Sequence, residues 1–241
     1  MKFALICGAS GNIGAAISQN LAQEGWSLYL HYYQNENVIF NLIEELRTRF
    51  PKQDFIPIQA NFRTEDAADI IDKSIFAVNA IIFAQGTTIY QLFDQFSSAQ
   101  LEDLWMEQLK TPMMIIQKLI NKIIRDENGR IIFIGSVYGA VGSSMEVPYS
   151  AIKGGISSFV NAYSREVASM GVTVNAVAPG AVSTNMNSNF GANEIAQINE
   201  EIPVGRFGFP DEISYVVMTL LNDKASYLTG QTVYVDGGWK K

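Results

Sequence analysis

Short apolar runs rich in β-branched residues alternate along this chain with longer stretches whose composition suits helices. Most runs carry apolar residues at both odd and even positions, which is the pattern of strands buried on both faces of a sheet. The rhythm predicts an α/β fold: a doubly wound parallel sheet of about seven strands with helices on both faces. The runs are FALIC, SLYLHY, DFIPIQA, NAIIFA, RIIFIGS, VTVNAVA and TVYVD. Helices are expected near 14–24, 37–50, 64–73, 99–124, 149–169, 192–201 and 210–222.

The chain has 241 residues, of which 48% are hydrophobic, and no composition shift, linker or repeat divides it. We therefore expect one domain over residues 1–241. The net charge of −7 disfavours nucleic-acid and anionic-membrane partners, because both need clustered Lys and Arg. The chain starts with a β-like run and has no stretch of about 18 apolar residues, so neither a signal peptide nor a transmembrane helix is expected. The sequence predicts a cytoplasmic protein.

Two residues limit metal and redox chemistry. Cys7 is the single cysteine, so an intramolecular disulfide is impossible, and its place in the first apolar run predicts a buried, inert thiol. The lone His31 has no second His or Cys at ligand spacing, which favours a structural role over a metal or catalytic one. No metal site is predicted.

Three glycines follow the first predicted strand and open the first predicted helix. Gly8, Gly11 and Gly14 have the spacing G-x-x-G-x-x-G. Glycines allow a sharp turn and a close approach of the backbone to a pyrophosphate, while the helix N-terminus offers free N–H groups. In a parallel sheet, ligands bind outside the carboxyl ends of the strands, where this loop lies. The loop alone does not distinguish a cofactor-binding loop from a plain strand-to-helix turn.

Other motifs favour the cofactor-binding interpretation of the loop. Ser136 ends the fifth predicted strand in IGSVYG, and VPYSAIKGG then places Tyr149 and Lys153 four residues apart on one helix face. With NAVAPGAVSTNM and the final YLTGQTVYVDGGW, the chain resembles the short-chain dehydrogenase/reductase family from end to end. Within that family it is most similar to the 3-oxoacyl-acyl-carrier-protein reductases, through REVASMGVTVNAVAPG and PVGRFGFPDEI. The resemblance implies a Rossmann-like fold and an oxidoreductase that interconverts a carbonyl and an alcohol.

The catalytic assignment is Ser136, Tyr149, Lys153 and Gln108. A tyrosine with a pKa of about 10 is a poor acid–base catalyst near pH 7 unless a cation stabilises its phenolate, and Lys153 can supply that charge. The resemblance implies that Lys153 also bonds the cofactor ribose and that Ser136 donates to the substrate oxygen. The family has an asparagine in a proton relay where this chain has Gln108, whose amide offers the same groups on a longer side chain.

The resemblance also assigns a set of cofactor-binding residues. Two of them depart from the family pattern: Asn12 replaces the middle loop glycine, where we expect asparagine to hold a turn at positive φ, and Asn61 replaces an aspartate that binds adenine. We expect the Asn61 carbonyl to accept a hydrogen bond from the adenine amino group. The set is Gly8, Ser10, Gly11, Asn12, Ile13, Gly14, Tyr32, Tyr33, Asn61, Phe62, Ala84, Gly86, Tyr149, Lys153, Pro179, Gly180, Val182 and Thr184.

The end of the second predicted strand bears on the choice between NAD(H) and NADP(H). An acidic residue there would pair with the ribose hydroxyls and repel a 2′-phosphate, but the chain has Tyr32, Tyr33 and Gln34. The missing carboxylate favours NADP(H). NAD(H) stays as the alternative, because Gly11 lacks the basic side chain that usually binds the phosphate.

The expected substrate is a small-molecule carbonyl or an acyl thioester. Carrier-protein reductases use two basic residues to dock an acidic carrier, and the matching positions here hold Glu127 and Met170. Residues 182–202 are expected to form a substrate lid, with apolar contacts from Met186, Phe190 and Ile195, or else a plain surface segment. The resemblance further implies a homotetramer or homodimer. The alternative function is a non-catalytic dinucleotide-binding module in regulation or assembly.

Overall fold

The computed structural model describes residues 2–126, 128–187 and 191–239. Seven strands form one sheet in the order β3-β2-β1-β4-β5-β6-β7, and each neighbouring pair is parallel. The predicted α/β fold is confirmed. The strands are β1 (Phe3–Cys7), β2 (Ser27–Tyr32), β3 (Phe55–Gln59), β4 (Ala80–Phe83), β5 (Arg130–Ile134), β6 (Thr173–Pro179) and β7 (Thr232–Val235).

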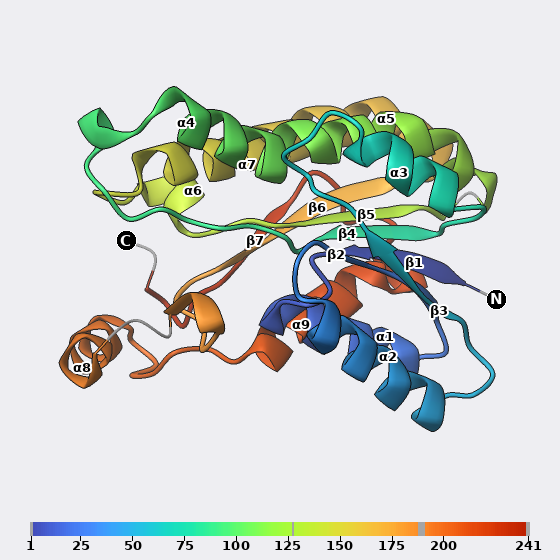
Figure 1. The fold of residues 1–241 in the computed structure, drawn as a ribbon, viewed down its shortest axis with the longest axis horizontal. Coiled ribbons are helices and arrows are strands. Elements are labelled where there is room, and N and C mark those ends of the chain that lie inside the picture. The colour runs from blue at the N-terminus through green and yellow to red at the C-terminus, as the bar shows by residue number, and fades with distance from the viewer. Residues whose placement is uncertain (1, 127, 188–190, 240–241) are drawn as a thin grey trace.

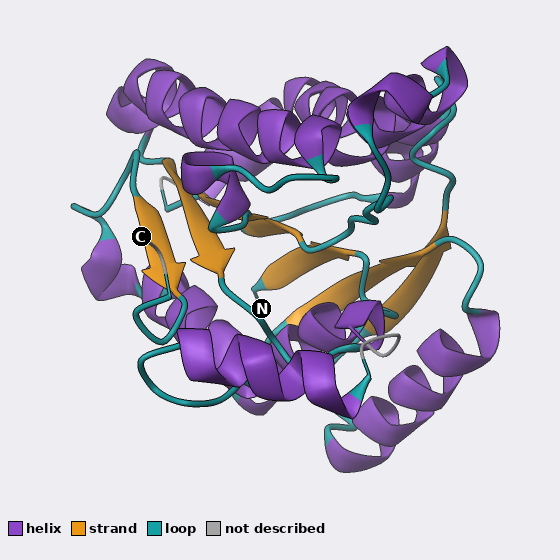
Figure 2. Ribbon diagram, turned by 90° about the vertical axis from the view of Figure 1, so that its left-hand side faces the viewer, coloured by secondary structure: helices purple, strands orange, loops and turns teal. Residues whose placement is uncertain are grey.

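Helices cover both faces of the sheet (Figures 1 and 2). One layer contains α3 (Ala67–Ser74), α4 (Ser98–Trp105), α5 (Thr111–Ile123), α6 (Tyr138–Val141) and α7 (Val147–Val167). The other layer contains α1 (Asn12–Gln23), α2 (Glu36–Arg49) and α9 (Pro210–Leu221), while α8 (Ala192–Glu201) lies at one end of the molecule. The sequence predicted every one of these helices except α6.

Because the strands are buried on both faces of the sheet, the protein has one hydrophobic core on each face. Alternate residues of one strand point to opposite faces, so Leu5 of β1 joins the core under α3, α5 and α7, while Ile6 joins the core under α1, α2 and α9. Both side chains are fully buried. Cys7 is buried as well, and burial raises the pKa of its thiol well above the usual value, as expected for an inert cysteine.

The strand order reverses between β1 and β4. From β1 the chain proceeds to β2 and β3 on one side, and then returns to place β4 on the other side of β1. The loops after β1 and β4 therefore diverge at the carboxyl edge and leave a crevice between them, which is the usual ligand position in such a sheet. The predicted glycine turn stands at this point.

The long helix predicted over residues 99–124 is interrupted. The five residues Met106–Lys110 form a π-helical segment, η2, between α4 and α5, in which the N–H of Thr111 donates to the carbonyl of Met106. Pro112 has no N–H to donate four residues back, to Gln108, and its ring crowds that carbonyl, so the helix widens there. The predicted helix is confirmed in extent, because α4, η2 and α5 follow one another without a gap, but the π-helical turn was not predicted, and Pro112 was the signal for it.

The glycine turn brings three segments of backbone close together. Gly8 has φ +76°, and a Cβ atom there would lie 2.7 Å from the backbone of Gln85 after β4. A Cβ atom on Gly14 would collide with the carbonyl oxygen of Gly8, whereas one on Gly11 would lie 3.4 Å from that oxygen, in ordinary contact. The close packing at Gly8 and Gly14 leaves the start of α1 facing the crevice.

Gly14→Ala is expected to destabilise the protein by about 1–3 kcal/mol, the usual effect of overpacking. Gly11→Ala is the matched control, since Gly11 has an ordinary φ of −83° and room for a methyl group. Urea unfolding of both variants measures the difference. Equal free energies of unfolding in the two variants would contradict the proposed collision.

Candidate active site

A cavity of about 320 Å³ opens at the carboxyl edge, between the loops that follow β1, β2, β3 and β4. The structure brings nine of the predicted cofactor residues together there: Gly8, Ser10, Gly11, Tyr32, Tyr33, Asn61, Phe62, Ala84 and Gly86. The sequence analysis missed five further polar lining residues: Asn35, Arg63, Gln85, Thr87 and Glu107. Four other predicted residues lie at the end of β6 or just after it, outside the lining: Pro179, Gly180, Val182 and Thr184. Of these, Gly180 packs against Asp236 after β7.

His31 joins the glycine turn to its neighbours. The N–H of Gly8 donates to its Nδ1 atom over 3.0 Å, so Nε2 carries the proton and donates to the carbonyl of Ala60 over 3.0 Å. The ring is buried and stacks on Phe62 with centroids 4.1 Å apart. Burial lowers the pKa of His31 from 6.5 to about 4, although the Ala60 carbonyl opposes this. His31 therefore has the structural role that was expected: from β2, its ring binds Gly8 after β1 and Ala60 after β3.

One of the two expectations about the departures from the family pattern was wrong. Asn12 is the first residue of α1, and Met145 is the one non-glycine residue with positive φ among those described, so Asn12 makes no such turn. Its Oδ1 atom instead accepts the N–H of Asn185, which ties the glycine turn to the segment after β6. The side-chain oxygen of Asn61 accepts the N–H of Arg63 over 3.1 Å and has a second lone pair, so its bond to the adenine amino group stays a prediction. Ile13 is half-buried in the first turn of α1, next to the loop.

Ser136, Tyr149 and Lys153 meet at the end of β5. The side chain of Ser136 interacts with the Tyr149 hydroxyl and opposes the rise of its pKa. The Nζ atom of Lys153 lies 5.3 Å from the centre of the Tyr149 ring and donates to the carbonyl of Ile134 over 2.9 Å. The backbones of α6 and α7 pack tightly here, because a Cβ atom on Gly139 would lie 2.7 Å from the main chain of Lys153. The sequence analysis missed helix α6. This helix follows Ser136 and packs against α7, which carries Tyr149 and Lys153.

Burial acts in opposite directions on the two ionisable groups. It raises the pKa of Tyr149 from 10 to about 12, although the interaction with Ser136 opposes this, and the charge of Glu146 adds to the rise. It lowers the pKa of Lys153 from 10.5 to about 8, and the charge of Glu107 opposes that fall. The ligand-free site thus keeps the phenol protonated and the lysine mostly cationic at neutral pH.

Gln108 lies in the π-helical segment and is 1% exposed. Its Nε2 atom donates to the carbonyl of Thr87 over 2.8 Å, while its Oε1 atom is buried without a partner. A Cβ atom on Gly86 would lie 3.0 Å from that oxygen, so a glycine at this position leaves room for the longer amide. An unsatisfied buried acceptor is costly and is normally met by a water or a ligand group.

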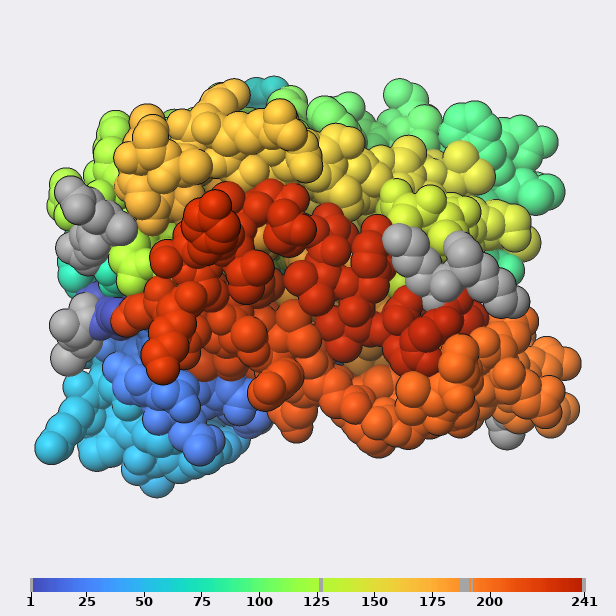
Figure 3. Space-filling view, turned by 180° about the vertical axis from the view of Figure 1, so that it is seen from behind, coloured from blue at the N-terminus to red at the C-terminus, as the bar shows by residue number. Residues whose placement is uncertain are grey.

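The structure describes residues 182–187 and 191–202 of the predicted lid. Val182 is buried and pairs with Gly208, whereas Met186 and Ile195 are exposed and make no closed apolar contact. Phe190 lies outside the described residues. Helix α8 forms an outer corner of the molecule next to the C-terminal residues (Figure 3), where the indole of Trp239 donates to Glu201 over 3.2 Å. The lid's role in substrate binding stays a prediction.

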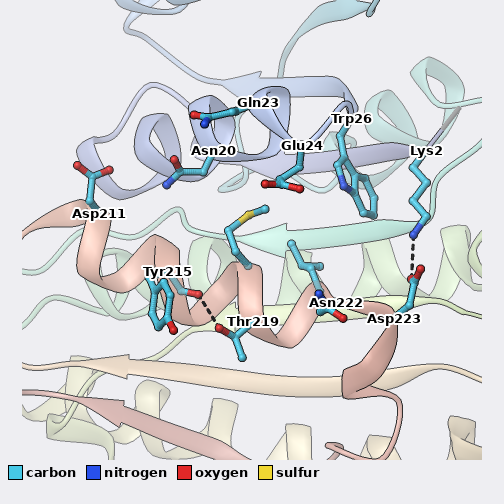
Figure 4. Close-up of a pocket in the computed structure, with 12 residues that line it drawn as sticks. Lys2, Asn20, Gln23, Glu24, Trp26, Asp211, Tyr215, Thr219, Asn222 and Asp223 are labelled. Carbon is cyan, nitrogen blue, oxygen red and sulfur yellow. Dashed lines mark hydrogen bonds and ion pairs between the residues drawn. The ribbon is translucent and has the colours of Figure 1, made fainter.

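A larger hollow of about 830 Å³ lies between α1 and α9 (Figure 4). It opens near the start of β1, at the sheet edge opposite the glycine turn, and Lys2 there forms an ion pair with Asp223 at 2.8 Å. None of Ser136, Tyr149 and Lys153 lines it. Among the described residues, no group of three or more His, Cys, Asp or Glu could hold a metal ion, and no helix is long and apolar enough to cross a membrane.

The carboxyl-edge cavity, the glycine turn and the Ser136, Tyr149 and Lys153 group define a class of protein, the α/β oxidoreductases that bind a nicotinamide dinucleotide. A family model described as enoyl-(acyl carrier protein) reductase matches residues 8–240. The chain belongs to the short-chain dehydrogenase/reductase family.

Named relatives match nearly the whole chain. An uncharacterized oxidoreductase of Bacillus subtilis, YmfI, is 41% identical over 239 residues, which are 99% of this chain and 98% of the relative. The 3-oxoacyl-[acyl-carrier-protein] reductase FabG of Staphylococcus aureus is 33% identical over 241 residues, covering 98% of this chain and 97% of the relative. The crystal structure of YwfH, an NADPH-dependent reductase involved in bacilysin biosynthesis, superposes with a TM-score of 0.92 at 23% identity. It covers 100% of this chain and 98% of its own, and shows the same fold.

The pKa of His31 predicts a pH-dependent stability. Between pH 6.5 and about 4 the unfolded chain binds a proton at His31 that the folded protein does not, so the free energy of unfolding falls as the pH falls through this window. The loss reaches about 3 kcal/mol at the low end. His31→Gln, which removes the titration, should flatten the pH dependence of urea unfolding in this window. The same slope in the variant and the wild type would assign the acid sensitivity to other groups.

Proposed function

We propose that the protein is an NADP(H)-dependent reductase that interconverts a carbonyl and an alcohol, acting on a small ketone or a 3-oxoacyl thioester. The observation that carries the proposal is the buried contact of Lys153 with Tyr149, combined with the side chain of Ser136, whose interaction with the Tyr149 hydroxyl lowers the pKa of that tyrosine. Membership of the short-chain dehydrogenase/reductase family supports the reaction class. The 33% identity to a 3-oxoacyl-acyl-carrier-protein reductase supports the thioester among the candidate substrates.

The residues present suit a nicotinamide dinucleotide. The cavity has a glycine turn whose close packing excludes side chains at Gly8 and Gly14 and leaves the N-terminus of α1 facing it. Gly8, Ser10 and Gly11 would hold the pyrophosphate, Tyr32 and Tyr33 the adenosine ribose, and Asn61 and Phe62 the adenine. The cofactor supplies the hydride when bound. Lys153 would bond its nicotinamide ribose.

The chain's own side chains handle the proton. Tyr149, protonated in the resting site, donates its phenolic proton to the carbonyl oxygen as negative charge develops there. Ser136 donates a hydrogen bond to the same oxygen. Lys153 stabilises the phenolate that remains, since its ammonium group lies near the tyrosine ring. Gln108 completes the route to solvent, with its unpartnered Oε1 atom as the acceptor for a relay water.

The charges around the cavity support NADP(H). The residue after Tyr32 and Tyr33 is Gln34, and no carboxylate from this segment lines the described part of the cavity, which favours a 2′-phosphate. Arg63 and Glu107 are the formally charged residues in the described lining, and the two pair with each other at 2.8 Å. Because this pairing leaves little free positive charge, NAD(H) stays as the alternative.

The substrate end of the site argues against strong docking of an acidic carrier protein. Met170, at one of the positions where carrier-protein reductases have a basic residue, is 47% exposed. The other position, Glu127, lies outside the described residues. The chain's net charge of −7 would further repel an acidic partner. We therefore favour a free carbonyl compound or a thioester with a different carrier. Assembly as a homotetramer or homodimer and a cytoplasmic location are part of the same proposal.

Tyr149→Phe is expected to lower kcat at least about a hundredfold, because it removes the proton donor and keeps the ring. Tyr163→Phe is the matched control, since this tyrosine lies on the same helix, away from the site, and stacks on Phe159. Turnover is measured with a panel of ketones and 3-oxoacyl thioesters. Full activity of Tyr149→Phe would contradict the assignment, and cofactor binding without any turnover in the wild type would favour the non-catalytic binding module.

NADPH is expected to give the higher kcat/KM of the two reduced cofactors. Tyr33→Asp, which places a carboxylate at the end of β2, should lower kcat/KM with NADPH and change it less with NADH, because the new charge repels only the 2′-phosphate. Steady-state kinetics with both cofactors check this. A clear NADH preference in the wild type would overturn the NADP(H) assignment.

A further inference from the structure

The Glu107 carboxylate lies at the junction between the two ends of the cavity. Its Oε2 atom accepts hydrogen bonds from the Nη2 atom of Arg63 over 2.8 Å and the Nε atom over 3.1 Å, and from the hydroxyl of Thr87 over 3.0 Å. The side chain of Glu107 is 13% exposed. Arg63 follows β3 and Thr87 follows β4, so this one carboxylate joins two loops to the π-helical segment.

The backbone of the π-helical segment is tied to the same loop. The carbonyl of Glu107 accepts a hydrogen bond from Gln85 over 3.1 Å, and the next residue, Gln108, donates to the carbonyl of Thr87 over 2.8 Å. A widened turn lacks the regular hydrogen bonds of an α-helix, so these external bonds define its position. The carboxylate of Glu107 and the amide of Gln108 therefore hold the same stretch of loop, residues 85–87.

The π-helical segment also packs against the helix that carries Lys153. A Cβ atom on Gly155 of α7 would lie 3.1 Å from the side chain of Leu109. Burial lowers the pKa of Lys153, and Glu107 is the charged group that opposes this, because its negative charge favours the ammonium form. Arg63, which also lies 3.7 Å from Asp103, partly neutralises that charge.

We propose that Glu107, held by Arg63 and Thr87, is a positioning residue that fixes Gln108 in the relay and places a negative charge on the segment that packs against the helix of Lys153. It would thereby couple the adenosine end of the cavity, where Arg63 lies, to the proton-transfer end. The inference rests on the proposed function for its consequence in catalysis. Its structural content, a charge pair acting on Lys153, holds for the ligand-free protein.

The other groups around Lys153 are accounted for. The Tyr149 ring lies beside it on α7, the Ile134 carbonyl of β5 accepts its hydrogen bond, and the charge of Glu107, on the π-helical segment, acts on its pKa. Glu146 and Tyr138 act on Tyr149. Glu146 is itself occupied by the hydroxyls of Thr88 and Ser143. A change at Arg63 or Glu107 alters none of these partners directly.

The test is an NMR titration of the ligand-free protein labelled with 13C at the lysine ε-carbon, with the Lys153 signal assigned from Lys153→Arg. Glu107→Gln removes the negative charge and should lower the pKa of Lys153. Arg63→Gln leaves Glu107 without its counter-charge and should raise it. Each shift is expected on the order of a few tenths of a pH unit or more. Arg63→Lys, which keeps the charge, should return the pKa towards the wild-type value.

Asp69→Asn is the control, because it breaks the exposed Lys118–Asp69 ion pair on the outer surface of α3 and α5 and should leave Lys153 unchanged. Opposite shifts in Glu107→Gln and Arg63→Gln support the proposal. Shifts in the same direction, or no shift in either, would overturn it, because a purely structural role predicts no opposition of sign.

The pH profile of kcat gives the catalytic readout. The alkaline limb, where Lys153 loses its proton, should move to lower pH in Glu107→Gln and to higher pH in Arg63→Gln, with KM changed less than kcat. The two readouts separate two failures. If the opposed NMR shifts occur but no substrate is turned over by the wild type, the proposed function fails and the charge coupling stands. If turnover occurs with unshifted limbs and unshifted NMR titrations, the coupling fails and the function stands.

Discussion

A parallel sheet buried on both faces directs ligand-binding chemistry in this molecule to the carboxyl ends of its strands. The side chains of β1 alternate between two hydrophobic cores, so a polar group on the strand would lose its water without gaining a partner. At the carboxyl edge the backbone N–H and carbonyl groups are free to bind, and the strand order reverses there. The glycine turn, His31 and the end of β5 all lie at this edge.

Lys153 carries a charge at this edge although it is buried. It is 4% exposed, and its ammonium group is anchored to the carbonyl of Ile134 at the last residue of β5. Desolvation favours the neutral amine and, at Tyr149, the neutral phenol, so burial alone would leave the pair uncharged. The proton stays on the phenol, which is the form that the proposed reduction requires, while the charge of Glu107 favours the ammonium form of the lysine. The environment thus prepares the acid and its stabilising cation before any ligand arrives.

The sequence was sufficient for the features that depend on local patterns. Seven apolar runs gave the sheet, and the i, i+4 spacing of Tyr149 and Lys153 placed both side chains on one face of α7. It was insufficient where the outcome depends on contacts between residues distant in the chain. Asn12 could be read only as a turn residue, because its partner, Asn185, lies 173 positions away. Arg63 and Glu107 are 44 positions apart, and nothing in either neighbourhood marks them as a pair. The π-helical segment could have been predicted from the sequence, since Pro112 cannot continue a regular helix.

The exchange of asparagine for Gln108 makes physical sense only with its surroundings. A longer amide in an unaltered site would either collide with the opposite loop or leave its donor unsatisfied. Here Gly86 provides the space for its oxygen, and the carbonyl of Thr87 accepts from its nitrogen. The widened helix shifts the backbone from which the side chain starts, and Glu107 fixes that backbone through Arg63 and Thr87. Glycine, proline and the ion pair are therefore parts of one arrangement, in which the extra methylene of Gln108 is accommodated by the loop and helix on either side of it.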